Sequence, residues 1–278
     1  MIGVPGTSTN DCGSVVALWR YPVKSMMGEE LNASYIGDRG LLGDRVYAIV
    51  DPETGKVASA KHPKKWPHLF DCRAAFVDPL GAGDEIPPVQ VTLPDGRVTR
   101  CDDTDFDEAI SAMLGRSGAL QTAVPEKPAL EEYWPDIEGL ALRETVTDEA
   151  MPEGTFFDVA MVHIVTTSTL DRLRELYPDG RFEARRFRPN IVVQTTAGDK
   201  SFTEGDWVGR TLTVGEEVRL KVTAPCQRCV MTTLAQGDLP RDPGILRTAA
   251  QHEKAQVGIY AEVLHGGSAR RGDRVRLD

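Results

Sequence analysis

Residues 211–234 read TLTVGEEVRLKVTAPCQRCVMTTL, in which apolar residues typical of β-strands run into a Cys-x-x-Cys pair. Residues such as Val, Leu and Thr in short runs, broken by Gly-containing turns, predict strand. The pair Cys226 and Cys229 is therefore expected at the end of a strand. In thioredoxin-like redox proteins the same spacing stands at the start of a helix.

The composition is that of a globular protein. The chain has 278 residues, of which 41% are hydrophobic and 27% are charged, enough for one large domain or two smaller ones. The formal net charge of −10 disfavours nucleic acid as a partner, and a small anionic ligand would need a local basic pocket. The first residues have no basic segment, and no run approaches the roughly 20 apolar residues of a membrane span. We therefore expect a cytoplasmic protein without a membrane anchor.

The first half of the chain is predicted to be mostly β. Polar turns separate short apolar segments, VQVTLPDGRVTRC indicates a hairpin around Pro94-Asp95-Gly96, and one helix has Phe106, Ile110 and Met113 on one side and ends at Gly115. Pro-rich, acidic residues without periodicity follow. The predicted organisation is an N-terminal domain over 13–120, a linker over 121–153 and a second domain over 154–278. The predicted strands of the first domain are 15–19, 30–36, 46–50, 89–93 and 97–101.

The second half combines strands with a few helices, which makes the fold class mainly β with some α. An apolar strand over 156–166 leads into a helix capped by Thr167 or Ser168 and ended by Pro178. A short helix is expected over 244–253. A closing pair of strands, 257–264 and 274–278, is expected around Gly266 and Gly267.

The residues around the cysteine pair leave several kinds of site open. Five cysteines in a cytosolic protein argue against a disulfide framework, so the pair is available for metal or redox chemistry. A structural zinc site would need two further ligands, and there is no second Cys-x-x-Cys or His-x-x-x-His. YPVKS at 21–25 and RRFRPN at 185–190 could each be an ordinary turn or a solvated basic strip. Together, in an acidic chain, they favour one local anion site.

Six motifs in one order resemble a known family. RYPVKSMMGEEL, GLLGDRVYAIVD, RFRPNIVV, CQRCVMTT, GIYAEVL and GDRVRL are similar to the MOSC proteins, named after the C-terminal domain of molybdenum cofactor sulfurase. They most resemble the branch that has an extra N-terminal domain and includes the mitochondrial amidoxime-reducing component. The resemblance extends from about Gly13 to Asp278. It implies an N-terminal β-barrel domain followed by a C-terminal MOSC β-barrel-like domain.

The resemblance also implies a molybdenum-pyranopterin (molybdopterin) cofactor whose metal is held by the thiolate of Cys229, and not by Cys226. A soft thiolate suits such a metal, and Arg and Lys suit the cofactor's phosphate. Arg228, next to Cys229, is expected to help ionise the thiol. The cofactor-binding residues implied by the resemblance are Lys24, Ser25, Arg45, Thr166, Thr167, Ser168, Arg188, Asn190, Gln227, Arg228 and Tyr260.

The implied activity is reduction of small N-hydroxylated compounds such as amidoximes and hydroxylamines. The chain lacks an iron–sulfur cysteine cluster and a Gly-x-Gly-x-x-Gly motif, so electrons would come from a separate protein of the ferredoxin or cytochrome b5/flavin reductase type. Two alternatives remain open at this point. One is a sulfur carrier with a persulfide on Cys229, and the other is a non-catalytic molybdenum cofactor-binding protein. His163 is expected to be a packed strand residue.

Overall fold

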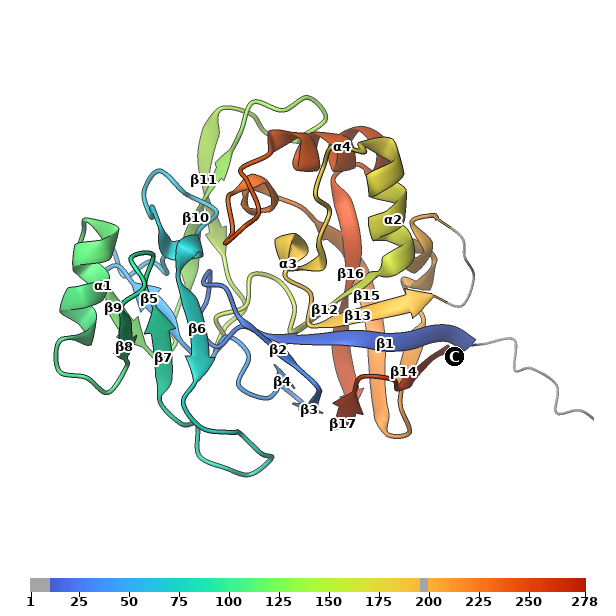
Figure 1. Cartoon of the computed structure of the whole chain (residues 1–278), viewed down its shortest axis with the longest axis horizontal. Helices are drawn as coiled ribbons and strands as arrows, with labels where there is room; N and C mark the ends of the chain where they lie inside the picture. Colours follow the sequence, from blue (N-terminus) through green and yellow to red (C-terminus); the bar gives the residue numbers. More distant parts are fainter. Residues whose placement is uncertain (1–10, 196–199) are drawn as a thin grey trace, which may run out of the picture.

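The computed structural model describes residues 11–195 and 200–278. Its main body is a closed barrel of seven strands, in the order β13-β12-β16-β15-β14-β18-β1, which closes where β1 pairs with β13 (Figure 1). Only β12 and β13 run parallel among these pairs. The strands are β1 (Asp11–Arg20), β12 (Val162–Thr166), β13 (Ile191–Thr195), β14 (Thr211–Val214), β15 (Val218–Gln227), β16 (Gln256–His265) and β18 (Arg274–Leu277).

The barrel interior forms the largest apolar core. All five residues of β12 are buried, because one face lines the interior and the other packs under α2 (Thr167–Leu176). Barrel residues from both ends of the chain share this core, including Val15, Leu18, Ile191 and Val275. β1 falls within 13–120 but completes a barrel otherwise built from the C-terminal half.

Most of the remaining N-terminal part forms a second unit with its own apolar core, on the left of Figure 1. The predicted hairpin is present as β7 (Val89–Thr92) and β8 (Val98–Arg100), and the predicted helix as α1 (Phe106–Leu114), which ends at Gly115 with a positive φ of 66°. The other elements of this unit are β5 (Ala48–Val50), η1 (Leu69–Asp71), β6 (Arg73–Phe76) and β9 (Ala119–Gln121). β2 (Glu29–Leu31) instead extends the barrel sheet beside β1, and β3 (Ala33–Gly37) pairs with β4 (Gly40–Leu41) and packs against the barrel core.

Residues 121–153, expected to link the two domains, contain an antiparallel hairpin. β10 (Ala129–Trp134) pairs with β11 (Thr145–Ala150) along its whole length. The hairpin brings Glu132 of β10 to the ion pair with Lys61 described below.

Two local predictions for the second half are wrong. The strand expected over 156–166 begins only at Val162, and the residues before it form an irregular segment that includes Phe157 and Asp158. The two closing strands do not pair with each other, because β16 lies between β12 and β15, and β18 lies between β14 and β1. Gly266 is followed instead by β17 (Gly267–Arg270), which pairs with β3.

The remaining helices lie outside the barrel, where α2 packs against β12 and β13 and α4 (Pro243–Glu253) packs against β16 (Figure 1). α2 has its N-cap at Thr166, one residue before the expected cap, and the Thr166 hydroxyl accepts a hydrogen bond from the Thr169 amide. In the described part of the chain, no helix is both long and apolar enough to cross a membrane. The other helices are α3 (Ala184–Phe187), η2 (Thr203–Trp207) and η3 (Val230–Thr233).

Candidate functional site

A cavity of about 660 Å³, counting its open mouth, lies where the barrel meets the N-terminal unit. Its walls come from segments far apart in the sequence: the residues before β12, the turn from α3 into β13, the turn from β15 into η3, and two cations of the N-terminal part, Arg45 and Lys61. The lining includes Phe157, Asp158, Val159, His163, Arg186, Arg188, Asn190, Cys226, Gln227, Arg228, Cys229, Met231 and Tyr260.

The two cysteines differ in position and burial. Cys226 is the penultimate residue of β15 and is 2% exposed, whereas Cys229 is partly exposed and is the N-cap residue of η3. The pair thus ends a strand, as expected, but Cys229 also begins a short 3-10 helix. Cys72, Cys101, Cys226 and Cys229 are free thiols. Burial, with Glu132 nearby, raises the pKa of the Cys229 thiol to about 12, although Lys61 opposes this change.

Arg228 does not ionise Cys229, contrary to our expectation, because its side chain points back into the protein. Its guanidinium donates hydrogen bonds to the carbonyl oxygens of Val257 (2.7 Å from Nε) and Phe187 (2.9 Å from Nη1), and Nη2 contacts His163 Nε2. Arg228 therefore braces the wall of the cavity.

His163 is a packed strand residue, as expected, and it also lines the cavity. Burial and the charge of Arg228 hold the pKa of His163 well below its usual range, so the ring is neutral and can accept from Arg228. The contact requires glycine at position 258. A Cβ there would lie 2.5 Å from His163 Nε2 and 2.6 Å from the Ile164 carbonyl oxygen, and φ is +79°.

Two guanidinium groups flank the ring of Tyr21 at another wall of the cavity. Cζ of Arg188 lies 4.1 Å from the ring centroid and Cζ of Arg45 lies 4.7 Å from it. Arg45 is paired with Asp44. Arg188 donates one hydrogen bond to the Met26 carbonyl oxygen (2.6 Å), and among residues 11–195 and 200–278 no carboxylate lies within ion-pair distance of its guanidinium. Burial, together with the charge of Arg45, lowers the pKa of Arg188 to about 10.

Asn190 fixes the segment that follows Arg188. Its side-chain amide donates to Asp44 Oδ2 (2.9 Å), and its Oδ1 accepts from the His163 amide (3.0 Å). Asp44 in turn pairs with Arg45 and accepts from the Tyr21 amide (2.7 Å). A single buried carboxylate therefore holds residues from both parts of the cavity wall.

A second group of charges lies on the side of Cys229. Lys61 Nζ donates to Glu132 Oε2 (2.9 Å) and lies 3.6 Å from Asp158 Oδ2, while Asp158 also pairs with Lys24. Burial works to lower the pKa of Lys61, but Asp158, Cys229 and Glu132 raise it well above its usual range. Burial likewise opposes ionisation of Asp158, yet Lys24 and Lys61 hold its pKa well below normal. Lys61 is therefore a charged ammonium group beside the thiol.

Sequence reasoning missed Lys61, Asp158 and Glu132 as members of this site. Lys61 and Glu132 stand in segments without a recognisable motif. Asp158 could have been recognised as a candidate site residue, because it is a charged residue inside the otherwise apolar run FFDVAMV.

The expected residues separate into two sets. Those that line the cavity are Arg45, Arg188, Asn190, Gln227, Arg228, Cys229 and Tyr260. Tyr260 packs edge-on against His163, with the ring centroids 5.9 Å apart, and Gln227 donates to the Lys254 carbonyl oxygen (3.1 Å). Lys24, Ser25, Thr166, Thr167 and Ser168 are not among the lining residues.

The residues outside the cavity have structural contacts of their own. Lys24 is buried and bonded to Asp158 and the Phe156 carbonyl oxygen, and Ser25 Oγ accepts from the amide of Ala60, next to Lys61. Thr166 donates to the buried Glu204 (2.6 Å), close to a different hollow of the surface. Lys24 and Ser25 thus support the wall from behind, whereas the turn 166–168 faces elsewhere.

Comparison with known families identifies the kind of protein to which this cavity belongs. The MOSC N-terminal beta barrel domain matches residues 12–104, and the MOSC domain matches residues 153–276. The chain is a MOSC-domain protein with an N-terminal domain of the MOSC_N type.

Named relatives are distant. Molybdenum cofactor sulfurase from Homo sapiens is 25% identical over 281 residues, which cover 90% of this chain and 30% of that protein. Mitochondrial amidoxime-reducing component 1 from Mus musculus is 25% identical over 234 residues, covering 80% of this chain and 66% of that protein. The chain thus spans less than a third of the sulfurase. Among solved structures, the YuaD protein from Bacillus subtilis is 12% identical with a TM-score of 0.49, covering 97% of each chain.

Proposed function

We propose that this protein binds a molybdenum-pyranopterin cofactor and reduces small N-hydroxylated compounds with it. The observation that carries the proposal is one cavity that joins a cysteine thiol to the Arg188 guanidinium, which is buried and has no carboxylate partner among the residues that the structure describes. Such a group binds an anion well, because its charge is already removed from water. The names of the relatives, an amidoxime-reducing component and a molybdenum cofactor sulfurase, support both the cofactor and the reaction.

The side chains that line the cavity fit a molybdenum-pyranopterin cofactor. Cys229 would hold the metal, since it is partly exposed in the cavity, while Arg188 and Arg45 would bind the phosphate. The Cys229 thiol must lose its proton to become a ligand, and the ammonium of Lys61 stabilises the resulting negative charge. When bound, the cofactor supplies two-electron oxygen-atom chemistry.

Lys61 has a further part in the reaction that we propose. Its ammonium donates to Glu132, is too far from Asp158 for a hydrogen bond, and so retains donors for an oxygen atom in the cavity. The two carboxylates keep it charged, and the buried side chains of Phe157 and Met231, which line the same cavity, restrict water. A hydrogen bond from Lys61 would hold the oxygen of an N-hydroxylated substrate and favour its departure. Electrons would come from a separate donor protein.

A sulfur carrier remains the second candidate, because the chain matches molybdenum cofactor sulfurase over 90% of its length. In that case Cys229 would hold a persulfide in the same cavity. A non-catalytic cofactor-binding protein would use the same contacts without turnover.

Purified protein from a host that makes the cofactor tests the proposal directly. We expect close to one equivalent each of molybdenum and pterin. Cys229→Ser should lose the metal and all reduction of benzamidoxime with a chemical electron donor, because a neutral hydroxyl is a poor ligand for such a metal. Cys226→Ser should keep both, since Cys226 lines the cavity but is only 2% exposed, and serine is nearly the same size.

The outcomes separate the candidates. Equal loss in the two serine variants would restore a paired-cysteine site, and stoichiometric zinc without molybdenum would refute the cofactor proposal. A transferable persulfide on cofactor-free protein would favour the sulfur carrier. Full cofactor without reduction of any N-hydroxylated compound would favour the binding protein.

A further inference from the structure

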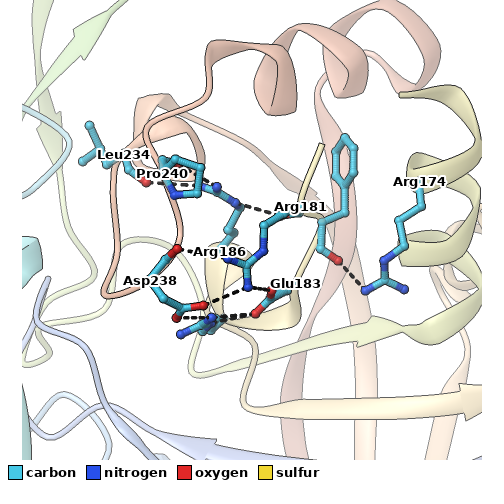
Figure 2. Close-up of polar contacts among 9 residues, drawn as sticks. Arg174, Arg181, Glu183, Arg186, Leu234, Asp238 and Pro240 are labelled. Atoms are coloured by element: carbon cyan, nitrogen blue, oxygen red, sulfur yellow. Dashed lines mark hydrogen bonds and ion pairs between the residues drawn. The ribbon is translucent and has the colours of Figure 1, made fainter. Parts of the chain in front are cut away.

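The side chain of Arg186, in α3, is one of the most buried in the molecule, at 1% exposure. Within the described part of the chain its guanidinium donates only to backbone carbonyl oxygens: to Arg181 from Nε (2.8 Å), to Thr232 and Leu234 from Nη1 (3.3 and 3.1 Å), and to Pro240 from Nη2 (2.8 Å). Figure 2 shows this side chain reaching across to Leu234 and Pro240. One residue of α3 thus binds the segment that follows Cys229 at three points.

The two segments that Arg186 joins contain the two ends of the proposed site. Thr232 belongs to η3, whose N-cap is Cys229, and the Thr232 amide donates to the Cys229 carbonyl oxygen (3.2 Å). Arg188 stands two residues after Arg186 and ends α3 in the left-handed conformation, with φ of 54°. The thiol turn and the Arg188 turn are therefore tied together through one guanidinium.

Arg228 also joins the thiol turn to α3, through its hydrogen bond to the Phe187 carbonyl oxygen (2.9 Å). A further link, from the residues around α3 to the segment 232–240, lies at the surface. Arg181 donates to the carbonyl oxygen and Oδ2 of Asp238 (3.0 and 2.9 Å), and Arg185 pairs with Oδ1 of Asp238 (2.6 Å), as Figure 2 shows in part. Asp238 is well exposed, and exposed ion pairs contribute little to stability. Of the two links from this region to the segment 232–240, the buried Arg186 is therefore the stronger one.

We propose that Arg186 is a positioning residue that sets the separation between the Cys229 thiol and the Arg188 guanidinium. It acts through the backbone of η3 and does not take part in chemistry. Lysine cannot replace it, because three donors on a flexible stem do not match four carbonyls arranged around a planar fork. That a cofactor spans the two groups rests on the proposed function, whereas the positioning itself is a property of the cofactor-free protein.

The test compares Arg186→Lys with Arg174→Lys, both in cofactor-free protein. Arg174 also donates to a backbone carbonyl oxygen, that of Phe182 (2.6 Å), but it lies apart from Leu234 and Pro240, so it serves as the control for an Arg→Lys change (Figure 2). The measurement is the rate at which iodoacetamide labels Cys229, read by peptide mass spectrometry. Cys72, fully buried in the N-terminal core, reports global opening in the same sample.

We expect Arg186→Lys to raise the labelling rate of Cys229 about tenfold, which corresponds to the loss of one or two hydrogen bonds. The rate at Cys72 should stay unchanged, and Arg174→Lys should leave both rates at the wild-type level. In Arg186→Ala, a few millimolar free guanidinium should restore slow labelling of Cys229. Equal acceleration at Cys229 and Cys72, or no acceleration at Cys229, would refute the positioning role.

A second arm keeps this inference separate from the proposed function. In a cofactor-competent host, Arg186→Lys should contain less molybdenum than Arg174→Lys. If wild-type protein itself contains none, the cofactor proposal fails, and the labelling rates still decide whether Arg186 positions the thiol turn.

Discussion

Replacing Arg188 with Met should separate the stability of the fold from the binding of its ligand. Arg188 is 8% exposed, has no carboxylate within ion-pair distance among the described residues, and lies on the same tyrosine ring as Arg45. Such an arrangement is unfavourable for the cofactor-free protein. It becomes favourable when an anion enters the cavity, because the anion supplies the missing countercharge.

The size of the expected stability change follows from the pKa of Arg188, which falls from 12.5 to about 10 in the folded protein. At 1.36 kcal/mol per pKa unit, keeping the charge there costs about 3 kcal/mol. Met also removes the hydrogen bond to the Met26 carbonyl oxygen and the contact with the Tyr21 ring, together worth about 2 kcal/mol. The free energy of unfolding of the cofactor-free variant should therefore equal that of the wild type or exceed it by up to about 1 kcal/mol. Cofactor affinity should fall roughly 10- to 150-fold, the value of a charge-assisted bond.

Urea unfolding of the cofactor-free protein and molybdenum retention on dialysis measure the two quantities. Arg186→Met is the control, because it leaves several buried carbonyls without donors and should cost at least about 3 kcal/mol of stability. Loss of more than about 2 kcal/mol in Arg188→Met would contradict the reasoning about buried charge. Full retention of molybdenum in that variant would show that Arg188 does not bind the cofactor.

Three further predictions follow from the site. Lys61→Met should lower the turnover of benzamidoxime at least tenfold with molybdenum content unchanged, and equal loss of both would make Lys61 a cofactor ligand instead. The pKa of His163 in the folded protein lies below its usual value of 6.5, so below pH 6.5 the unfolded chain binds a proton that the folded protein does not. Stability should therefore fall as the pH drops below 6.5, and urea titrations should show a weaker fall for His163→Gln. The protein alone should not oxidise NADH or NADPH with benzamidoxime, and turnover without a donor protein would reveal a missed site.

Elements with a local signal could be predicted from the sequence. The β7–β8 hairpin has its turn residues between two apolar runs, and α1 has helical spacing with Gly115 as its end. The β10–β11 hairpin lacks such a signal, since its strands alternate weakly and are separated by ten residues. Local sequence patterns could not predict the closure of the barrel either. β1 pairs with β13, some 180 residues later in the chain, and this pairing depends on the assembly of the complete sheet.

The candidate site shows the same division. Motifs brought Cys229, Arg45 and Arg188 to attention, and the structure places all three around one cavity. The direction of a side chain depends on tertiary packing. The position of Arg228 next to Cys229 in the sequence therefore predicted the wrong contact, because its guanidinium turns toward Val257 and away from the neighbouring thiol. Lys61 entered the site only because the N-terminal unit packs against the η3 turn, where Ala60 and Met231 share one apolar cluster.

The distribution of charge connects the acidic chain with its basic cavity. A protein with a net charge of −10 has Lys61, Arg45 and Arg188 around one small space, and Arg188 lacks a carboxylate in the described part of the chain. A buried charge such as that of Arg188 opposes folding until a ligand neutralises it. A ligand that binds only the folded state stabilises it by RT ln(1 + [L]/Kd), so the Arg188 charge that costs stability in the cofactor-free protein becomes a gain in the loaded one. Arg188→Met should consequently raise or preserve the melting temperature without cofactor and lower it with cofactor, a change of sign that a residue of purely structural importance would not produce.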